Sequence, residues 1–216
     1  FWTLSVQFND NDKNSILASI TQLNDKKIEK FSFKNKGEID KAMEEVKSKK
    51  FNINDISSKV VNRNPSGPFT TSTLQQVSSG RLGFGASRTM QIAQKLYQGI
   101  EIDGETIGLI TYMRTDGTNL SMDAIDTFRK YIKNEFGDEY VPDNPASYSG
   151  KKAKNAQEAH EAIRPTDIMR APGTVKKYLS PDQHKLYDLI WSRALSSQMK
   201  PAQFDRNTIT ITSDDN

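Results

Sequence analysis

The sequence contains no cysteine, which excludes both a disulfide framework and a cysteine-ligated zinc site. It also lacks any apolar run near the roughly 20 residues that a membrane-spanning helix needs. No signal-peptide pattern opens the chain. We therefore expect a protein without a membrane partner, located in the cytoplasm.

Charge of one sign is also scarce, because 30 Lys and Arg face 27 Asp and Glu, a formal net charge of +3. A balance this even is no argument for nucleic-acid binding. Hydrophobic residues make up 35% of the chain, which suits a folded core. The 216 residues allow one large domain or two modest ones.

The distribution of charge is more informative than its total. Residues 65–100 contain Arg81, Arg88 and Lys95 but no acidic residue, and they are rich in Ser, Thr, Gln and Gly. Such a surface can approach phosphates without repulsion. A neutral helical surface is the alternative interpretation.

Strand patterns dominate the first 64 residues. Residues 1–8 alternate apolar and polar, so the chain starts inside a strand, as an excised piece of a longer protein would. A second apolar run at 16–23 precedes a turn at Asn24 and Asp25. Ile28, Phe31 and Phe33 suggest a third strand. A helix is expected at 38–47 and extended structure at 51–61.

Helices dominate the chain after a proline-rich linker at 64–68. The expected elements are helices at 70–79 and 86–98, a hairpin at 100–107 and an extended segment at 109–114. A helix capped by Ser121 and ended by Gly137, a short helix at 156–163, a helix at 180–198 with a capping box, and a strand at 208–212 follow. The fold class is therefore multi-domain α+β, with a mainly helical domain (65–199) inserted into a β-rich domain (1–64 and 200–216).

The run Gly-Leu-Ile-Thr-Tyr-Met-Arg-Thr-Asp at 108–116 holds the strongest candidate chemistry. If it is extended, Tyr112 and Arg114 point to the same side. A phenol is a weak nucleophile, and a neighbouring guanidinium favours the phenolate and stabilises charge on a phosphoryl group. Spacing alone leaves open an ordinary structural Tyr-x-Arg.

This run resembles the active-site signature of the bacterial type IA DNA topoisomerases. Four further blocks resemble the family in the same order: residues 68–76, 81–94, 118–121 and 157–166. The family commonly has serine directly after Thr-Asp, where this chain has Gly117. A hydroxyl contact from that position is therefore absent.

The resemblance implies that Tyr112 is the nucleophile, that Arg114 assists it, and that His160 helps to position the scissile phosphate. The expected DNA contacts are Arg81, Arg88, Lys95 and Arg164, of which Arg164 would share a helix face with His160. A surface histidine stacked on its own helix is the alternative for His160. His184 is interpreted as structural.

The resemblance also implies the function of the parent enzyme, which relaxes negatively supercoiled DNA without ATP through a 5′-phosphotyrosine intermediate. The helical domain would swing on the β-rich arch. Mg²⁺ is expected in the intact enzyme, bound by an acidic domain that this sequence lacks, and no metal is expected in this fragment. The expected partners are single-stranded and negatively supercoiled DNA and the remaining domains, in a monomer associated with the bacterial nucleoid.

Two other interpretations remain open. The helical pair after residue 68 could form a non-catalytic helix-turn-helix reader of DNA, although three basic residues are few for that role. The chain could also be a purely structural hinge. The fragment alone is expected to be inactive.

Overall fold

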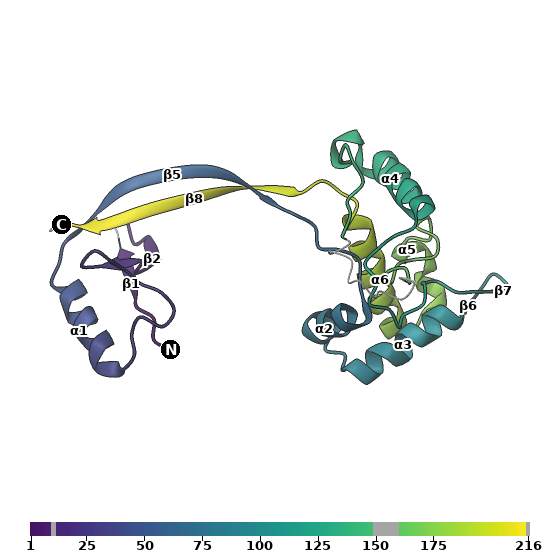
Figure 1. Ribbon diagram of the computed structural model, residues 1–216, viewed down its shortest axis with the longest axis horizontal. Helices are drawn as coiled ribbons and strands as arrows, with labels where there is room; N and C mark the ends of the chain where they lie inside the picture. Colours follow the sequence, from purple (N-terminus) through teal and green to yellow (C-terminus); the bar gives the residue numbers. More distant parts are fainter. Residues whose placement is uncertain (10–11, 149–159, 215–216) are drawn as a thin grey trace, which may run out of the picture. The chain divides into compact units, whose positions relative to one another are not determined.

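A computed structural model gives the structure of the chain and describes residues 1–9, 12–148 and 160–214. These residues form α-helices and small two-stranded sheets, so the protein is α+β (Figure 1). The chain divides into two compact units. Unit 1 comprises Phe1–Lys59 and Asp205–Asn216, and unit 2 comprises Val60–Phe204.

Unit 1 begins with two small hairpins. β1 (Ser5–Asn9) pairs antiparallel with β2 (Ser15–Ser19), and alternate residues of β1 are the less exposed ones, as the sequence pattern predicts. β3 (Gln22–Leu23) and β4 (Lys26–Lys27) pair across the predicted turn. Both turn residues have positive φ, which a two-residue hairpin of type I′ requires.

The predicted third strand around Ile28, Phe31 and Phe33 is wrong, because these residues follow β4 in irregular structure, with Phe31 in a turn. The spacing of two between Phe31 and Phe33 is typical of a strand. Of the three residues, however, only Phe33 is buried, and it packs against Ile39 and Ala42 of α1 (Lys36–Lys47). Phe31 is exposed. The predicted helix at 38–47 is confirmed, and Asn35 caps it by accepting the backbone N–H of Glu38.

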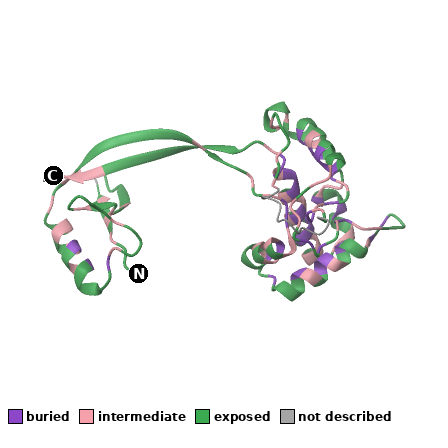
Figure 2. Cartoon of the chain, viewed as in Figure 1, coloured by how far each residue is buried: buried purple, intermediate pink, exposed green. Residues whose placement is uncertain are grey.

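Two long strands, β5 (Phe51–Arg63) and β8 (Ala202–Ser213), pair with each other. They contain the predicted extended segments and are longer than predicted. Most of their residues are exposed (Figure 2). The unit boundaries at 59/60 and 204/205 both fall within these strands. The backbone therefore passes between the units twice, along one pair of strands.

Unit 2 is built mainly from α2 (Thr71–Leu82), α3 (Ala86–Gln98), α4 (Met122–Phe136) and α6 (Pro181–Ser196). All four helices are predicted from the sequence: α3, α4 and α6 have an apolar face, and α2 is marked mainly by its start and end signals. Thr70 and Ser180 form capping boxes at the starts of α2 and α6. Gly83 ends α2 in the left-handed conformation at φ 68°.

Shorter elements complete unit 2. The predicted hairpin is confirmed as β6 (Ile100–Ile102) and β7 (Glu105–Ile107). The sequence analysis does not predict η1 (Asp138–Tyr140), α5 (Pro172–Val175) or η2 (Lys176–Tyr178), which are single turns too short for a periodic signal.

The predicted helix at 156–163 is wrong where the structure describes it. Residues 156–159 and the basic run at 151–154 lie outside the described residues. Residues 160–163 are extended, and Ile163 forms an antiparallel bridge with Phe69. The N–H of Ala162 donates to the carbonyl of Asn119 at 2.9 Å. This segment obtains its backbone hydrogen bonds from neighbouring loops, which a local helical pattern cannot reveal.

The core of unit 2 joins the helices to the loops that carry the candidate site (Figure 2). Its main cluster is formed by residues of α2, α3, α6 and the segments between them: Phe69, Leu74, Phe84, Ile92, Ala93, Leu96, Ile100, Ile102, Leu109, Ile110, Met113, Ile163, Val175, Leu186, Tyr187 and Ile190. His184 lies beside this core with Nε2 3.2 Å from the carbonyl oxygen of Pro172, a structural contact.

Among the helices that the structure describes, none combines the length and the apolar character needed to cross a membrane.

Candidate active site

The predicted nucleophile lies on a loop. Within residues 108–118, the structure contains one isolated bridge, between Ile110 and Pro165, and no strand. Burial nevertheless alternates: Met113 is 1% exposed, whereas Tyr112 is 41% exposed and Arg114 is also exposed. The buried Met113 anchors the loop in the core, so its two polar neighbours face solvent.

Threonine hydroxyls attach this loop to the start of α2. The Thr71 hydroxyl donates to the carbonyl of Met113 at 2.7 Å and accepts the backbone N–H of Thr115 at 2.8 Å. The N–H of Thr71 donates to the carbonyl of Thr115 at 2.9 Å. Because these bonds flank Arg114 on both sides, they fix its backbone against the helix.

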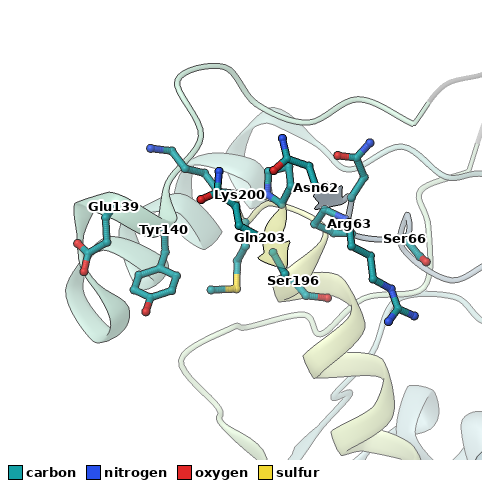
Figure 3. Close-up of a pocket in the computed structure, with 13 residues that line it drawn as sticks. Asn62, Arg63, Ser66, Glu139, Tyr140, Ser196, Lys200 and Gln203 are labelled. Carbon is teal, nitrogen blue, oxygen red and sulfur yellow. The ribbon is translucent and has the colours of Figure 1, made fainter. Parts of the chain in front are cut away.

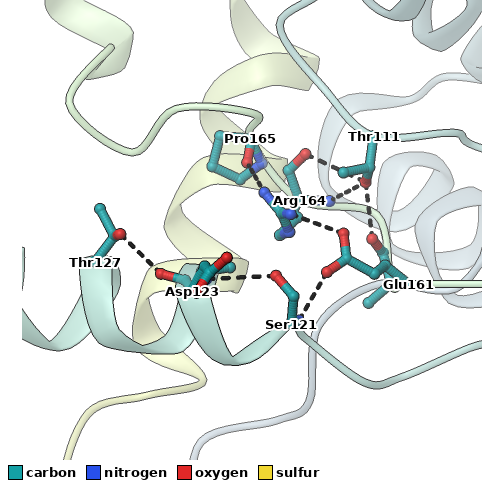
Figure 4. Close-up of polar contacts among 9 residues, drawn as sticks. Thr111, Ser121, Asp123, Thr127, Glu161, Arg164 and Pro165 are labelled. Carbon is teal, nitrogen blue, oxygen red and sulfur yellow. Dashed lines mark hydrogen bonds and ion pairs between the residues drawn. The ribbon is translucent and has the colours of Figure 1, made fainter.

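Thr111 attaches the other side of the loop to the histidine segment, residues 160–164. Its hydroxyl donates to the carbonyl of Ala162 at 2.8 Å, and its N–H donates to the carbonyl of Arg164 at 2.9 Å (Figure 4). The N–H of Arg164 donates back to the Thr111 hydroxyl at 3.0 Å. The histidine segment and the tyrosine loop therefore form one hydrogen-bonded unit.

Two rings flank the Tyr112 side chain. The ring of Tyr97, from α3, lies edge-on with its centroid 5.4 Å away, and the imidazole of His160 lies edge-on at 6.3 Å. Aromatic pairs prefer this T-shaped arrangement. The two neighbours limit the positions that the phenol can take, while its exposed side stays open to solvent.

A cavity of about 340 Å³ lies beside this loop. It is lined by Thr70, Thr71, Ser72, Arg114, Thr115, Asp116 and His160. Two of the three predicted catalytic residues, Arg114 and His160, thus line one cavity although 46 positions separate them in the sequence. The third, Tyr112, lies next to this cavity, because its ring contacts the imidazole of His160.

The charges around this cavity favour an anion. The start of α2 contributes the positive end of the helix dipole. Among the described residues, the guanidinium of Arg114 has no hydrogen-bond or ion-pair partner, so its donors are available. Asp116 adds one negative charge at the rim. A phosphodiester placed here would meet the guanidinium of Arg114 and the side chain of His160.

Arg164 does not share a helix face with His160, because residues 160–163 are extended. Its guanidinium pairs with the Glu161 carboxylate at 2.7 Å and donates to the carbonyl of Pro165 at 3.0 Å (Figure 4). The other oxygen of Glu161 accepts the N–H of Ser121 at 2.7 Å. Burial would raise the pKa of Glu161, but the bonds from Ser121 and Arg164 outweigh it and lower that pKa.

The three basic residues of 65–100 lie on α2 and α3 and are exposed. Arg88 forms an ion pair with Asp182 and stacks on the ring of Phe84. Lys95 and Arg81 lie in the last turns of their helices, at positions that also favour a positive charge in any helix.

Sequence reasoning missed Tyr97 and Thr71 as parts of the site. Tyr97 falls on the apolar period of α3, a position that predicts a buried side chain, yet it is 40% exposed. The run of hydroxyl residues at 70–73 suggested a helix start, and it also supplies the loop contacts and part of the cavity wall. Only the fold reveals these pairings.

A larger cavity of about 820 Å³ lies elsewhere in unit 2 and contains none of the predicted site residues. Figure 3 shows Glu139 and Tyr140 on one side of it and Arg63 and Ser66 on the other. Hydroxyl groups and cations also line this cavity, but none of its lining residues belongs to the segments that carry Tyr112, Arg114 and His160. The smaller cavity is the better candidate site.

Within the described residues, no three His, Asp or Glu side chains gather closely enough to hold a metal ion. The Mg²⁺ that the resemblance implies does not fit any site described in this chain.

The comparisons with known proteins identify the family of this chain. All of residues 1–216 match the family model described as DNA topoisomerase. The chain therefore belongs to the DNA topoisomerase family.

The relatives are DNA topoisomerase 1 proteins of bacteria. The chain is 47% identical to that of Rickettsia bellii over 214 residues, which is 99% of this chain and 27% of the relative. It is 44% identical to that of Haemophilus influenzae over 215 residues, 100% of this chain and 23% of the relative. The chain spans about a quarter of the length of these curated relatives.

The comparison with solved structures also finds a topoisomerase. The chain matches full-length topoisomerase I from Thermotoga maritima with a TM-score of 0.71 and 36% identity, covering 100% of this chain and 33% of that one. Nothing in these comparisons favours the helix-turn-helix alternative.

Proposed function

We propose that this chain is the nucleophile-bearing part of a type IA DNA topoisomerase and that Tyr112 forms the covalent bond to DNA. The observation that carries the proposal is the position of Tyr112: an exposed phenol on an otherwise anchored loop, next to a cavity lined by Arg114 and His160. Membership of the DNA topoisomerase family supplies the reaction class.

In the proposed reaction the Tyr112 oxygen attacks the phosphorus of one strand. The new O–P bond leaves the protein joined to the 5′ phosphate, and the bond to the 3′ oxygen breaks. The phenol proton leaves as the attack proceeds, and the departing 3′ oxygen takes up a proton. Because one phosphodiester replaces another, religation is the reverse reaction and no ATP is needed.

Arg114 and His160 are assigned to the phosphoryl oxygens. Arg114 has free donors in a planar fork, which match two phosphate oxygens. His160 can donate to a phosphate oxygen, most strongly as the imidazolium. The start of α2, whose residues Thr71 and Ser72 line the same cavity, adds the positive end of the helix dipole. Stabilising charge that develops in the transition state accelerates both cleavage and religation.

The domain arrangement is part of the proposal. We assign residues 1–64 and 200–216 to a β-rich arch domain and residues 65–199 to an inserted helical domain that carries the tyrosine. The two passages of the backbone along β5 and β8 support this assignment. The helical domain would move on the arch to open a gate for the second strand.

The partners follow from the reaction. We propose single-stranded and negatively supercoiled DNA as substrate, and the remaining domains of the parent enzyme as the source of acidic groups and Mg²⁺. Arg81 and Lys95 are the DNA contacts that the structure leaves most available, whereas Arg88 and Arg164 would first have to leave their acidic partners. The parent enzyme would act as a monomer in the bacterial cytoplasm, associated with the nucleoid.

The test is covalent trapping in the parent enzyme. A labelled single-stranded oligonucleotide should remain on the denatured enzyme, and Tyr112→Phe should abolish this adduct while binding persists. Tyr140→Phe is the matched control, because Tyr140 is 46% exposed and lies away from the cavity. An adduct with Tyr112→Phe would assign the nucleophile to another residue.

A further inference from the structure

Gly117 faces the main chain of His160 at very short range. A Cβ atom on Gly117 would lie 1.8 Å from the carbonyl oxygen of His160 and 3.0 Å from its carbonyl carbon. Carbon and oxygen atoms that are not bonded normally stay about 3.3 Å or more apart. Any side chain at position 117 therefore requires the carbonyl of His160 or the loop to move by about 1 Å or more.

The loop around Gly117 cannot move freely. The N–H of Gly117 donates to the Thr115 hydroxyl at 3.0 Å, and that hydroxyl lies 3.5 Å from the carbonyl oxygen of His160. The N–H of Thr115 is itself bonded to Thr71 at 2.8 Å. The tyrosine loop is thus anchored on the side that faces His160.

The histidine segment is anchored from the next residues onward. The N–H groups of Ala162 and Ile163 donate to the carbonyls of Asn119 and Phe69 at 2.9 and 2.8 Å. His160 precedes these bonds, so a side chain at position 117 would displace His160 first. Its imidazole is the ring that lies edge-on to Tyr112.

We propose that Gly117 is a positioning residue for strand cleavage: it lets the main chain of His160 approach closely and so sets the place of the imidazole beside Tyr112. This inference rests on the proposed function. The close approach of the Gly117 backbone to the carbonyl of His160 leaves no room for a Cβ atom in this chain. The absence of a side chain, rather than the loss of a hydroxyl, is then the functional feature of Gly117.

The test compares two glycine variants of the parent enzyme. Gly117→Ala should slow single-turnover cleavage of an oligonucleotide by about 10–100-fold, since a misplacement of about 1 Å in a site can cost about 10²-fold. Gly80→Ala is the matched control, because a Cβ there meets no atom within 4 Å. Binding of single-stranded DNA should be unchanged in both variants.

The His160→Ala background separates positioning from general damage. If Gly117 acts through the imidazole, Gly117→Ala should slow cleavage in the wild-type background and have little further effect in His160→Ala. Equal slowing in both backgrounds, or no slowing at all, would overturn the inference. A Tyr112→Phe enzyme that still forms the adduct would instead overturn the proposed function.

Thr115→Val provides a second route if Gly117→Ala does not fold. Valine keeps the shape of threonine but removes the hydroxyl that connects Gly117 with the carbonyl of His160. Its slowing of cleavage should likewise disappear in the His160→Ala background, with the thermal unfolding midpoint measured alongside. Slowing that persists there would contradict the inference.

Discussion

The tyrosines of unit 2 differ in what their hydroxyl groups do. Tyr148 donates to the carbonyls of Pro65 and Ser197, and Tyr187 donates to the carbonyl of Arg170. Burial raises the pKa of both hydroxyls, which opposes the phenolate. Among the described residues, the Tyr112 hydroxyl has no such partner, and its ring lies next to a cavity with free cationic donors. The environments of Tyr148 and Tyr187 therefore oppose the role of nucleophile, whereas that of Tyr112 is compatible with the proposed one.

Arg114→Lys tests the guanidinium at the scale of one side chain. Lysine keeps the charge but loses the planar fork, so cleavage in the parent enzyme should slow without disappearing. Loss of one donor to a transition-state oxyanion typically costs about 10²–10³-fold in rate. Single-turnover cleavage measures the effect, and DNA binding should persist because affinity is spread over many phosphate contacts. A wild-type rate would make Arg114 a structural neighbour only.

Between elements, the Glu161 carboxylate connects the histidine segment to the start of α4. It accepts the N–H of Ser121, the cap of α4, and pairs with Arg164. Since the pKa of Glu161 is lowered in the folded protein, the ionised form stabilises the fold above the ordinary glutamate pKa of about 4.3. That contribution is lost as the pH falls through the lowered value.

Glu161→Gln should remove this pH dependence. Glutamine can still accept the Ser121 N–H but loses the charge, so the free energy of unfolding at neutral pH should fall by about 1 kcal/mol, reduced by partial exposure to solvent. Urea unfolding at pH 7 and at about pH 3 measures both effects, and the variant should differ from wild type less at the acidic pH. Asp138→Asn is the control, because its pair with Lys133 is highly exposed. A variant with the wild-type pH profile would contradict this role.

Helices with an apolar face and clear signals at both ends were predictable from the sequence. Segments whose hydrogen-bond partners lie far away in the chain were not. α3 and α6 have an apolar face and clear caps or stops, and both were predicted. The extended residues 160–163 fail as a helix because their hydrogen-bond partners, Phe69 and Asn119, lie far away in the chain. The prediction of Tyr112 as the nucleophile depends on the resemblance of its surrounding motif to a family, because spacing alone leaves a structural tyrosine open. Tyr97 lies beside it through folding alone.

On the scale of the whole molecule, the 216-residue chain by itself should not relax supercoiled plasmid DNA. It spans 27% of the Rickettsia bellii relative, and the proposed reaction needs acidic groups and Mg²⁺ from the remainder. Gel analysis of plasmid topoisomers measures the outcome, with the parent enzyme as the positive control. Relaxation by the chain, abolished by Tyr112→Phe, would show that the described residues suffice.

The pairing of β5 with β8 also imposes an order on biosynthesis. A ribosome completes β5 at Arg63 but makes β8, which starts at Ala202, only after roughly 140 more residues, so β5 has no partner while those residues are made. Unit 2 lies between the two strands and can fold while β5 waits. Its folding replaces a long flexible loop by a compact body, which lowers the entropy lost when the strands finally meet. Substitutions that slow the folding of unit 2 would therefore delay the pairing of β5 with β8, even where they contact neither strand. They would also prolong the time in which the exposed apolar residues of β5 can associate with other nascent chains.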